Sequence, residues 1–224
     1  MRTPRIIHVL FLLPCALAAQ PDRTTAPIDA RRTVVLKNNV HPLAQPRFDQ
    51  GPVEPAFRLG YVTLMLKKTD AQQAALDRLL AEQQDPASPN YHNWLTPEQY
   101  AERFGVSQHD LDKISAWLRS EGFTVEYVAR GRDWLAFSGT AGQVLATFRT
   151  EIHRYRVNGE MHFAAAAEPS IPAALVPVVS GIQGFDDFYP KAARRWLPAS
   201  LRLASRYRTS IVAPETTAFG VTLT

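Results

Sequence analysis

The residues of this sequence that we consider for catalysis or metal binding are its histidines, one serine beside a glycine and one pair of adjacent carboxylates. Histidine serves as a general base, a proton switch or a metal ligand, and serine acts as a nucleophile beside such a base. Ser138 precedes Gly139, and Asp186 adjoins Asp187. Beyond the N-terminal segment, the histidines are His41, His92, His109, His153 and His162.

None of these residues falls into a spacing that assembles a catalytic or metal centre. The histidines are scattered, and the sequence has neither a His-Glu-x-x-His pair for zinc nor a glycine-rich loop for phosphate. It has no Gly-x-Ser-x-Gly elbow to expose a nucleophilic serine. Asp186 and Asp187 alone offer too few oxygen ligands for calcium. We therefore expect no catalytic, metal-binding or cofactor-binding residue in this chain.

Two histidines lie among aromatic residues, and each has a structural and a functional interpretation. His153 alternates with Tyr155 and Val157 on one face of a predicted strand, which favours a packed or half-exposed structural role. His92 lies two residues before Trp94, a pattern that fits either a binding site or an aromatic plug that holds the loop against the domain. We expect packing in both places.

The stretch from 88 to 105 carries the clearest local signals. Thr96, Pro97 and Gln99 form a capping box with proline at the first helical position. Gly105 is placed to end the helix in the left-handed conformation, and Ser107 caps the next helix. The residues of this stretch that we expect to be structural are Tyr91, His92, Trp94, Leu95, Phe104 and Gly105.

The rest of the chain supplies the elements around this stretch. An extended arm is expected over 20–54, with a short strand at 33–36. Apolar patterns predict strands at 59–66, 123–127, 133–138, 151–157 and 160–164, and a closing segment at 182–188. Helices are expected at 69–84, 96–105, 108–121 and 140–148, and a short helical connection at 169–179. This order is typical of an α+β, ferredoxin-like (split βαβ) antiparallel sheet with helices on one face and one added hairpin.

Two long segments closely resemble the activation prodomain of the sedolisin (kumamolisin-like) serine peptidases. They are SPNYHNWLTPEQYAERFGVSQHDLDKISAWLRSEGF and FSGTAGQVLATFRTEIHRYRVNGEMHFAAAAEPSIPAALVPVVSGIQGFDDF. The resemblance covers residues 55–190 and implies a prodomain fold of the same ferredoxin-like kind. It implies a non-catalytic propeptide that assists folding of a secreted, acid-active peptidase and inhibits it until linker cleavage. The implied partner is the catalytic domain of such a peptidase.

The resemblance does not bring a catalytic site with it. The family's nucleophile lies in a Gly-Thr-Ser context within its catalytic domain, whereas Ala141 follows Gly139-Thr140 here. The calcium site of the family also belongs to that domain, so no cofactor is expected. The family's acid activation suggests candidate pH sensors of two kinds, which the sequence does not distinguish. Protonating Asp and Glu on the solvent faces removes ion pairs, and charging His153 and His162 at an interface adds repulsion.

We expect the segments at the two ends of the sequence to lie outside the domain. Residues 1–19 resemble a signal peptide, with Arg2 and Arg5 before an apolar run, so we expect secretion or periplasmic export. No apolar run is long enough for a membrane span. Residues 191–224 carry a net charge of +5 and are expected to be a basic linker, with cleavage near Arg194 and Arg195. Nucleic-acid binding is not expected, because the basic residues are spread along apolar sequence.

Three interpretations stay open from the sequence. The chain is a propeptide acting in cis as a fragment or frameshift product of a longer precursor, a stand-alone peptidase inhibitor acting in trans, or an unrelated secreted binding module. The first is preferred, because after Phe188 the sequence shows no recognisable start of a peptidase domain.

Overall fold

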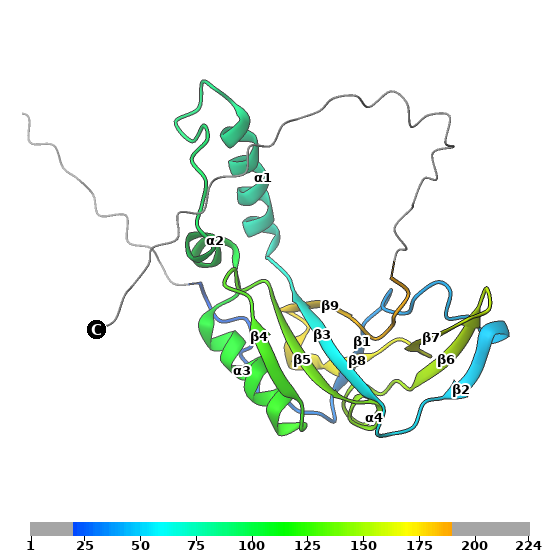
Figure 1. Cartoon of the computed structure of the whole chain (residues 1–224). Helices are drawn as coiled ribbons and strands as arrows, with labels where there is room; N and C mark the ends of the chain where they lie inside the picture. Colours follow the sequence, from blue (N-terminus) through cyan, green and yellow to red (C-terminus); the bar gives the residue numbers. More distant parts are fainter. Residues whose placement is uncertain (1–19, 190–224) are drawn as a thin grey trace, which may run out of the picture. The chain divides into compact units, whose positions relative to one another are not determined.

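The computed structural model describes residues 20–189 of the 224-residue chain. That stretch contains both helices and strands, and every strand pair is antiparallel (Figure 1). The α-helices are α1 Asp70–Gln84, α2 Pro97–Phe104, α3 Gln108–Ser120 and α4 Ala141–Phe148. The strands are β1 Thr33–Val35, β2 Asp49–Pro52, β3 Arg58–Leu66, β4 Thr124–Val128, β5 Trp134–Thr140, β6 Ile152–Val157, β7 Glu160–Ala165, β8 Ser170–Pro172 and β9 Val179–Gln183. Two 3-10 helices are η1 Pro46–Phe48 and η2 Ala173–Leu175. The predicted α+β class is confirmed.

The largest sheet has four strands in the order β4–β5–β3–β9. Thr63 in the centre of β3 lies opposite Ala136 of β5 on one side and Gln183 of β9 on the other. In this strand Leu64 is fully buried while Tyr61 is 58% exposed, because the core covers only one face of the sheet.

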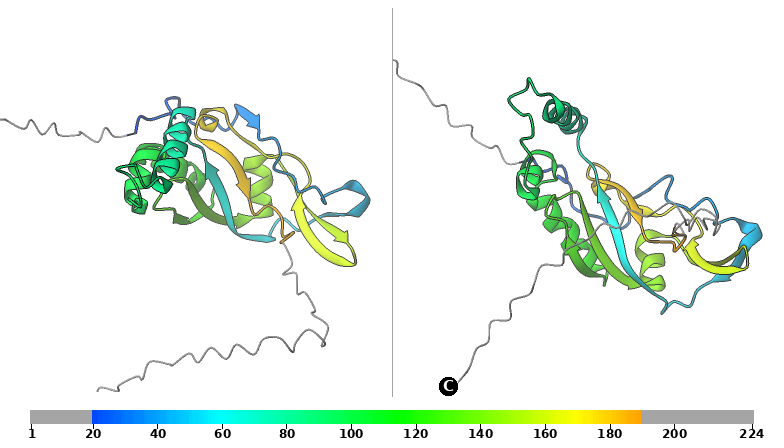
Figure 2. Two further views of the ribbon diagram at one scale, coloured as in Figure 1. Left: turned by 90° about the horizontal axis from the view of Figure 1, so that it is seen from above. Right: turned by 45° about the horizontal axis from the view of Figure 1, so that its top comes forward.

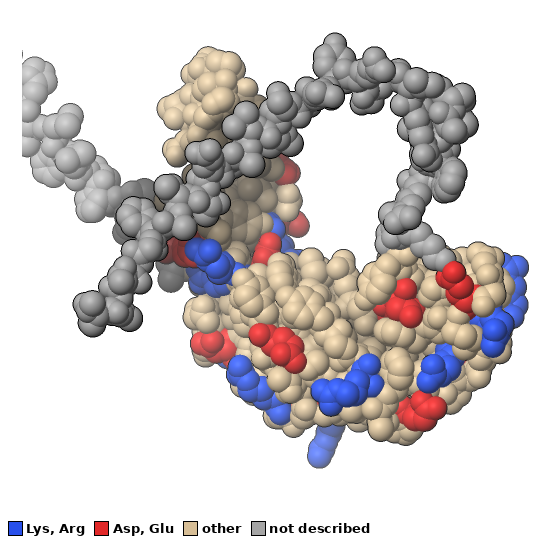
Figure 3. Space-filling view, viewed as in Figure 1, with Lys and Arg blue, Asp and Glu red and all other residues tan. Residues whose placement is uncertain are grey.

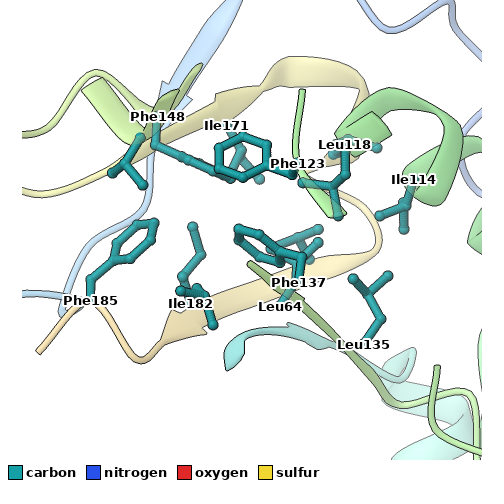
Figure 4. Packing of buried hydrophobic residues seen from close by; sticks show 14 of the residues in the cluster. Leu64, Ile114, Leu118, Phe123, Leu135, Phe137, Phe148, Ile171, Ile182 and Phe185 are labelled. Carbon is teal, nitrogen blue, oxygen red and sulfur yellow. The ribbon is translucent and has the colours of Figure 1, made fainter. Parts of the chain in front are cut away.

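The main core lies between this sheet and the helices α3 and α4. Ile114 and Leu118 of α3 and Phe148 of α4 face Phe137 and Leu64 of the sheet (Figure 4). Five aromatic contacts connect the centre of this cluster, with Phe148 taking part in four of them. The pairs are Trp117–Phe148, Phe123–Phe137, Phe123–Phe148, Phe137–Phe148 and Phe148–Phe185. Closely packed rings of this kind dominate the energetics of a core.

All four described α-helices begin at a side-chain cap, as predicted for Thr96 and Ser107. Thr69, Thr96 and Thr140 each form a full capping box with the glutamine three residues on, and Ser107 caps α3. The prediction for Gly105 is wrong, because its φ of −76° is not left-handed. A Cβ at Gly105 would lie 2.7 Å from the Gly131 carbonyl oxygen, so glycine is needed there for close backbone approach.

Helix α1 departs from the predicted arrangement with all helices on one face. It begins where β3 ends, extends beyond the sheet and packs against α2 (Figures 1 and 2). Leu79 and Gln83 are its only buried residues, and Leu80 is 51% exposed. Only α3 and α4 therefore contribute buried side chains to the sheet's core.

A second, three-stranded sheet has the order β2–β6–β7. Its hairpin turns at Asn158 and Gly159, which have φ values of 51° and 84°, as predicted for an Asn-Gly turn. The N-terminal arm supplies β2 to this sheet and β1 to a separate pair with β8. The strand predicted near Thr33 is therefore present, whereas the connection predicted to be helical over 169–179 contains β8 before η2.

None of the helices between residues 20 and 189 combines the length and hydropathy that crossing a bilayer requires. The described residues up to Phe188 belong to one compact unit.

Candidate functional site

The residues named for possible nucleophilic or metal chemistry are not assembled into a centre in the described part of the chain. Ser138 is buried in β5, and its hydroxyl donates a hydrogen bond to the Glu126 carboxylate of β4. Thr140 caps α4. Between residues 20 and 189 no group of three or more His, Cys, Asp or Glu side chains is arranged to hold a metal ion.

His153 on β6 is held between two carboxylates. Its Nδ1 lies 2.9 and 2.8 Å from the two oxygens of Asp49 on β2, and its Nε2 lies 3.0 Å from Glu151. Burial alone would lower the pKa of His153, but the hydrogen bonds to Glu151 and Asp49 outweigh it and raise that pKa above its usual value. Burial would likewise raise the pKa of Asp49, but hydrogen bonds from the Gly51 amide and His153 lower it.

His162 on the edge strand β7 also lies close to two carboxylates. Its Nδ1 lies 3.2 Å from Asp187, and its Nε2 lies 3.8 Å from Glu160. The ring of Phe188 stacks on His162 at 4.3 Å and on His41 at the same separation. The last residues of the domain are therefore fastened to β7 through a histidine, a carboxylate and a phenyl ring.

The face of the four-stranded sheet turned away from α3 and α4 carries exposed aromatic side chains. Trp134 of β5 lies opposite Met65 of β3, and the Trp134 ring lies 5.3 Å from the ring of Tyr127. Tyr127 is 44% exposed, whereas Ala136, which lies opposite it on β5, is fully buried. In the space-filling view charged side chains border this area but do not fill its centre (Figure 3).

A second exposed aromatic group lies on the loop between α1 and α2. The rings of Tyr91 and His92 stack at 3.8 Å, and Trp94 lies 5.8 Å from His92. Trp94 is 60% exposed, so these rings do not form the plug that the sequence suggested. The loop is held instead by Gln83 of α1, whose side-chain amide donates a hydrogen bond to the Asn93 carbonyl.

The other residues of the motif divide between surface and core. Leu95 is half-buried on this loop, whereas Phe104 and Gly105 are buried at the end of α2. The phenyl ring of Phe104 lies 5.5 Å from the ring of Tyr100. Phe104 and Gly105 are therefore packed inside the domain, whereas the rings of Tyr91, His92 and Trp94 are exposed.

One buried charge was not singled out from the sequence. Asp110 of α3 is fully buried and accepts hydrogen bonds from the backbone amides of Arg23 and Thr24 at 2.8 and 2.9 Å. Asp22 adds a 2.6 Å hydrogen bond from Ser107, which lowers the pKa of Asp22. The only sequence signal was an acidic residue in the first turn of a helix, where it is ordinarily attributed to the helix dipole.

Several predicted features lie outside the described residues. They are the signal segment 1–19, the linker 191–224 and the candidate cleavage residues Arg194 and Arg195.

Comparison with known proteins places this α+β domain in a peptidase-associated class. The family model for the pro-kumamolisin activation domain matches residues 48–188. Xanthomonalisin from Xanthomonas sp. is 37% identical over 126 residues, which is 56% of this chain and 15% of that protein. Sedolisin from Pseudomonas sp. is 26% identical over 187 residues, covering 80% of this chain and 31% of that protein. Tripeptidyl-peptidase 1 from Rattus norvegicus is 30% identical over 152 residues, covering 66% and 26% respectively.

The chain belongs to the pro-kumamolisin activation domain family, which occurs in the sedolisin group of peptidases. It spans less than a third of the length of these three relatives. The resemblance noted from the sequence is thereby confirmed, and the matched region is an activation domain rather than a peptidase domain.

Proposed function

We propose that this chain is a non-catalytic propeptide that binds the catalytic domain of a sedolisin-type peptidase, assists its folding and inhibits it. The family match over residues 48–188 is the observation that carries this proposal. The partner is met in cis if the chain is part of a longer precursor, and in trans if it acts as a free inhibitor.

The face of the four-stranded sheet turned away from α3 and α4 is the docking surface that we favour. Exposed aromatic residues surrounded by a polar rim are typical of interface centres. Tyr127 and Trp134 offer such an anchor, and Met65 beside them adds adaptable apolar surface. The opposite face of the sheet is occupied by the core, so it is not free to bind a partner.

Three further features complete the proposal. We infer that the sheet is ferredoxin-like, which the order β4–β5–β3–β9 supports, with α1 to α3 connecting β3 to β4 and α4 following β5. We infer export from the signal-like residues 1–19, and an action that needs no cofactor. Release is proposed to follow cleavage of the basic linker 191–224.

The docking surface is tested by inhibition in trans. The purified chain is titrated against an active sedolisin-type peptidase, and the inhibition constant is measured for wild type, Tyr127→Ala and Trp134→Ala. Truncating an aromatic anchor at an interface centre is expected to weaken inhibition by roughly tenfold or more. The folding role is measured separately, as the yield of active enzyme when the denatured catalytic domain refolds with the chain present.

Leu145→Ala is the matched control, because Leu145 is also an exposed apolar residue, at 46%, but lies on α4. It should inhibit as wild type does. Equal inhibition by all four proteins would place the docking surface elsewhere. A chain that neither inhibits such peptidases nor raises the refolding yield would contradict the propeptide function and favour an unrelated binding module.

A further inference from the structure

The three-stranded sheet carries two histidines with matching surroundings, one on each strand of its hairpin. His153 of β6 faces Asp49, which belongs to the N-terminal arm. His162 of β7 faces Asp187, at the C-terminal end of the domain. Each histidine therefore joins the central hairpin to a different end of the folded chain.

Both ring nitrogens of each histidine point toward carboxylates. For His153 the partners are Asp49 on Nδ1 and Glu151 on Nε2, and for His162 they are Asp187 and Glu160. A neutral imidazole has one N–H donor and one lone pair, whereas the imidazolium has two donors. A neutral His153 ring would thus direct a lone pair at a carboxylate, and only the protonated ring donates to both Asp49 and Glu151. His162 hydrogen-bonds Asp187 alone, because the 3.8 Å between its Nε2 and Glu160 is too long for a hydrogen bond.

The other titratable groups near these rings do not change the sign of this effect. Tyr155 lies beside His153 on β6 and opposite His162 on β7, and burial raises the pKa of its phenol, which keeps it neutral. His41 lies across the Phe188 ring from His162. The groups in direct ion-pair contact with His153 and His162 are all carboxylates.

We propose that two contacts, which we call staples, fasten the arm and the C-terminal end to the β6–β7 hairpin: His153 with Asp49 and Glu151, and His162 with Asp187. The staple at His153 closes as the pH falls through the histidine range and opens as it rises. This is opposite to the repulsion on acidification that the sequence suggested for His153. The inference concerns the folded domain itself and does not depend on the proposed peptidase partner.

The pH window follows from the directions of the pKa shifts. His153 has a raised pKa in the folded state, so its contribution to stability is complete below about pH 6.5 and is lost as the pH rises through the folded value. Asp49 has a lowered pKa, so the same contact persists on acidification until the pH falls through that value. The staple at β2 is thus strongest under mildly acidic conditions.

The test is amide hydrogen exchange on the purified full chain between pH 5.5 and 8.5, expressed as protection factors so that the intrinsic pH dependence cancels. Two backbone amides report on the two staples. The Val53 amide donates to the Ile152 carbonyl beside β2, and the Asp187 amide donates to the Phe163 carbonyl of β7. The Val53 protection factor is expected to fall across this range, because the raised pKa of His153 makes its contacts with Asp49 and Glu151 weaker as the pH rises. The Asp187 protection factor reports whether the His162 contact is intact.

Single variants separate the two staples. His153→Gln should remove the pH dependence at Val53, whereas His162→Gln should leave that pH dependence in place and lower the protection of the Asp187 amide. His92→Gln is the control, because His92 lies on the exposed loop between α1 and α2, and it should change neither. Protection of the Val53 amide that is constant or rises with pH in the wild-type protein overturns the proposal even if a variant fails to fold. Identical loss at both amides in both single variants would also overturn it.

Discussion

The sequence correctly indicated that position 105 requires glycine, but for the wrong reason. Its place at the end of a capped helix favoured a left-handed φ, but the backbone there is extended. The Gly131 carbonyl oxygen and the Cβ of Arg132 approach within 2.7 and 2.8 Å of where a Cβ would stand. This constraint comes from residues more than twenty positions away, so the local sequence cannot indicate it.

Gly105→Ala is therefore expected to destabilise the domain by about 1–3 kcal/mol, the cost of forcing backbone and side chains apart in a packed region. The free energy of unfolding in urea measures this. Gly60→Ala is the control, since a Cβ at Gly60 meets nothing within 4 Å. If both variants unfold at the same urea concentration, close approach is not the role of Gly105.

The role of Asp110 could not be predicted from the sequence. A buried carboxylate is costly unless hydrogen bonds satisfy it, and here two amides of the arm do so. The interaction joins residues more than eighty positions apart, and no local pattern reports such a contact.

Helix α1 is held to the rest of the domain by fewer buried side chains than α3. It has a full capping box, but it buries only Leu79 and Gln83, whereas α3 buries six side chains against the sheet and the arm. Helices of this length depend on tertiary packing more than on propensity.

We therefore expect amide exchange in the middle of α1 to be at least about tenfold faster than in the middle of α3, because local opening follows the density of buried contacts. Exchange followed by mass spectrometry or NMR at one pH measures both helices in a single sample. Equal protection would show that α1 opens only with the whole domain.

At the scale of the whole molecule, charge separates the domain from its tail. The 224 residues carry a formal net charge of +4, to which residues 191–224 contribute +5. Arg2 and Arg5 contribute a further +2, so the residues between these two segments carry −3. The exposed aromatic face of the sheet and the two histidine staples both belong to this acidic domain.

If the tail is the proposed cleavable linker, a sedolisin-type peptidase at acid pH should cut it and leave the domain intact. Intact-mass analysis after limited digestion is expected to show a product that ends near Arg194 and Arg195. Replacing both arginines by glutamine should slow that cut by about tenfold if basic side chains position the chain in the cleft. Cleavage inside residues 20–188 at the same rate would contradict the assignment.

The sequence by itself determined the α+β class, the three capping boxes, the Asn-Gly hairpin turn and the family, because each depends on residues close together along the chain or on one long motif. It also named His153 and His162. Only the tertiary structure decided what those histidines face, that α1 leaves the sheet, and that Trp94 is exposed. Contacts between distant segments set the surroundings of a side chain, and the sign of a histidine's effect depends on whether its neighbours are carboxylates or cations.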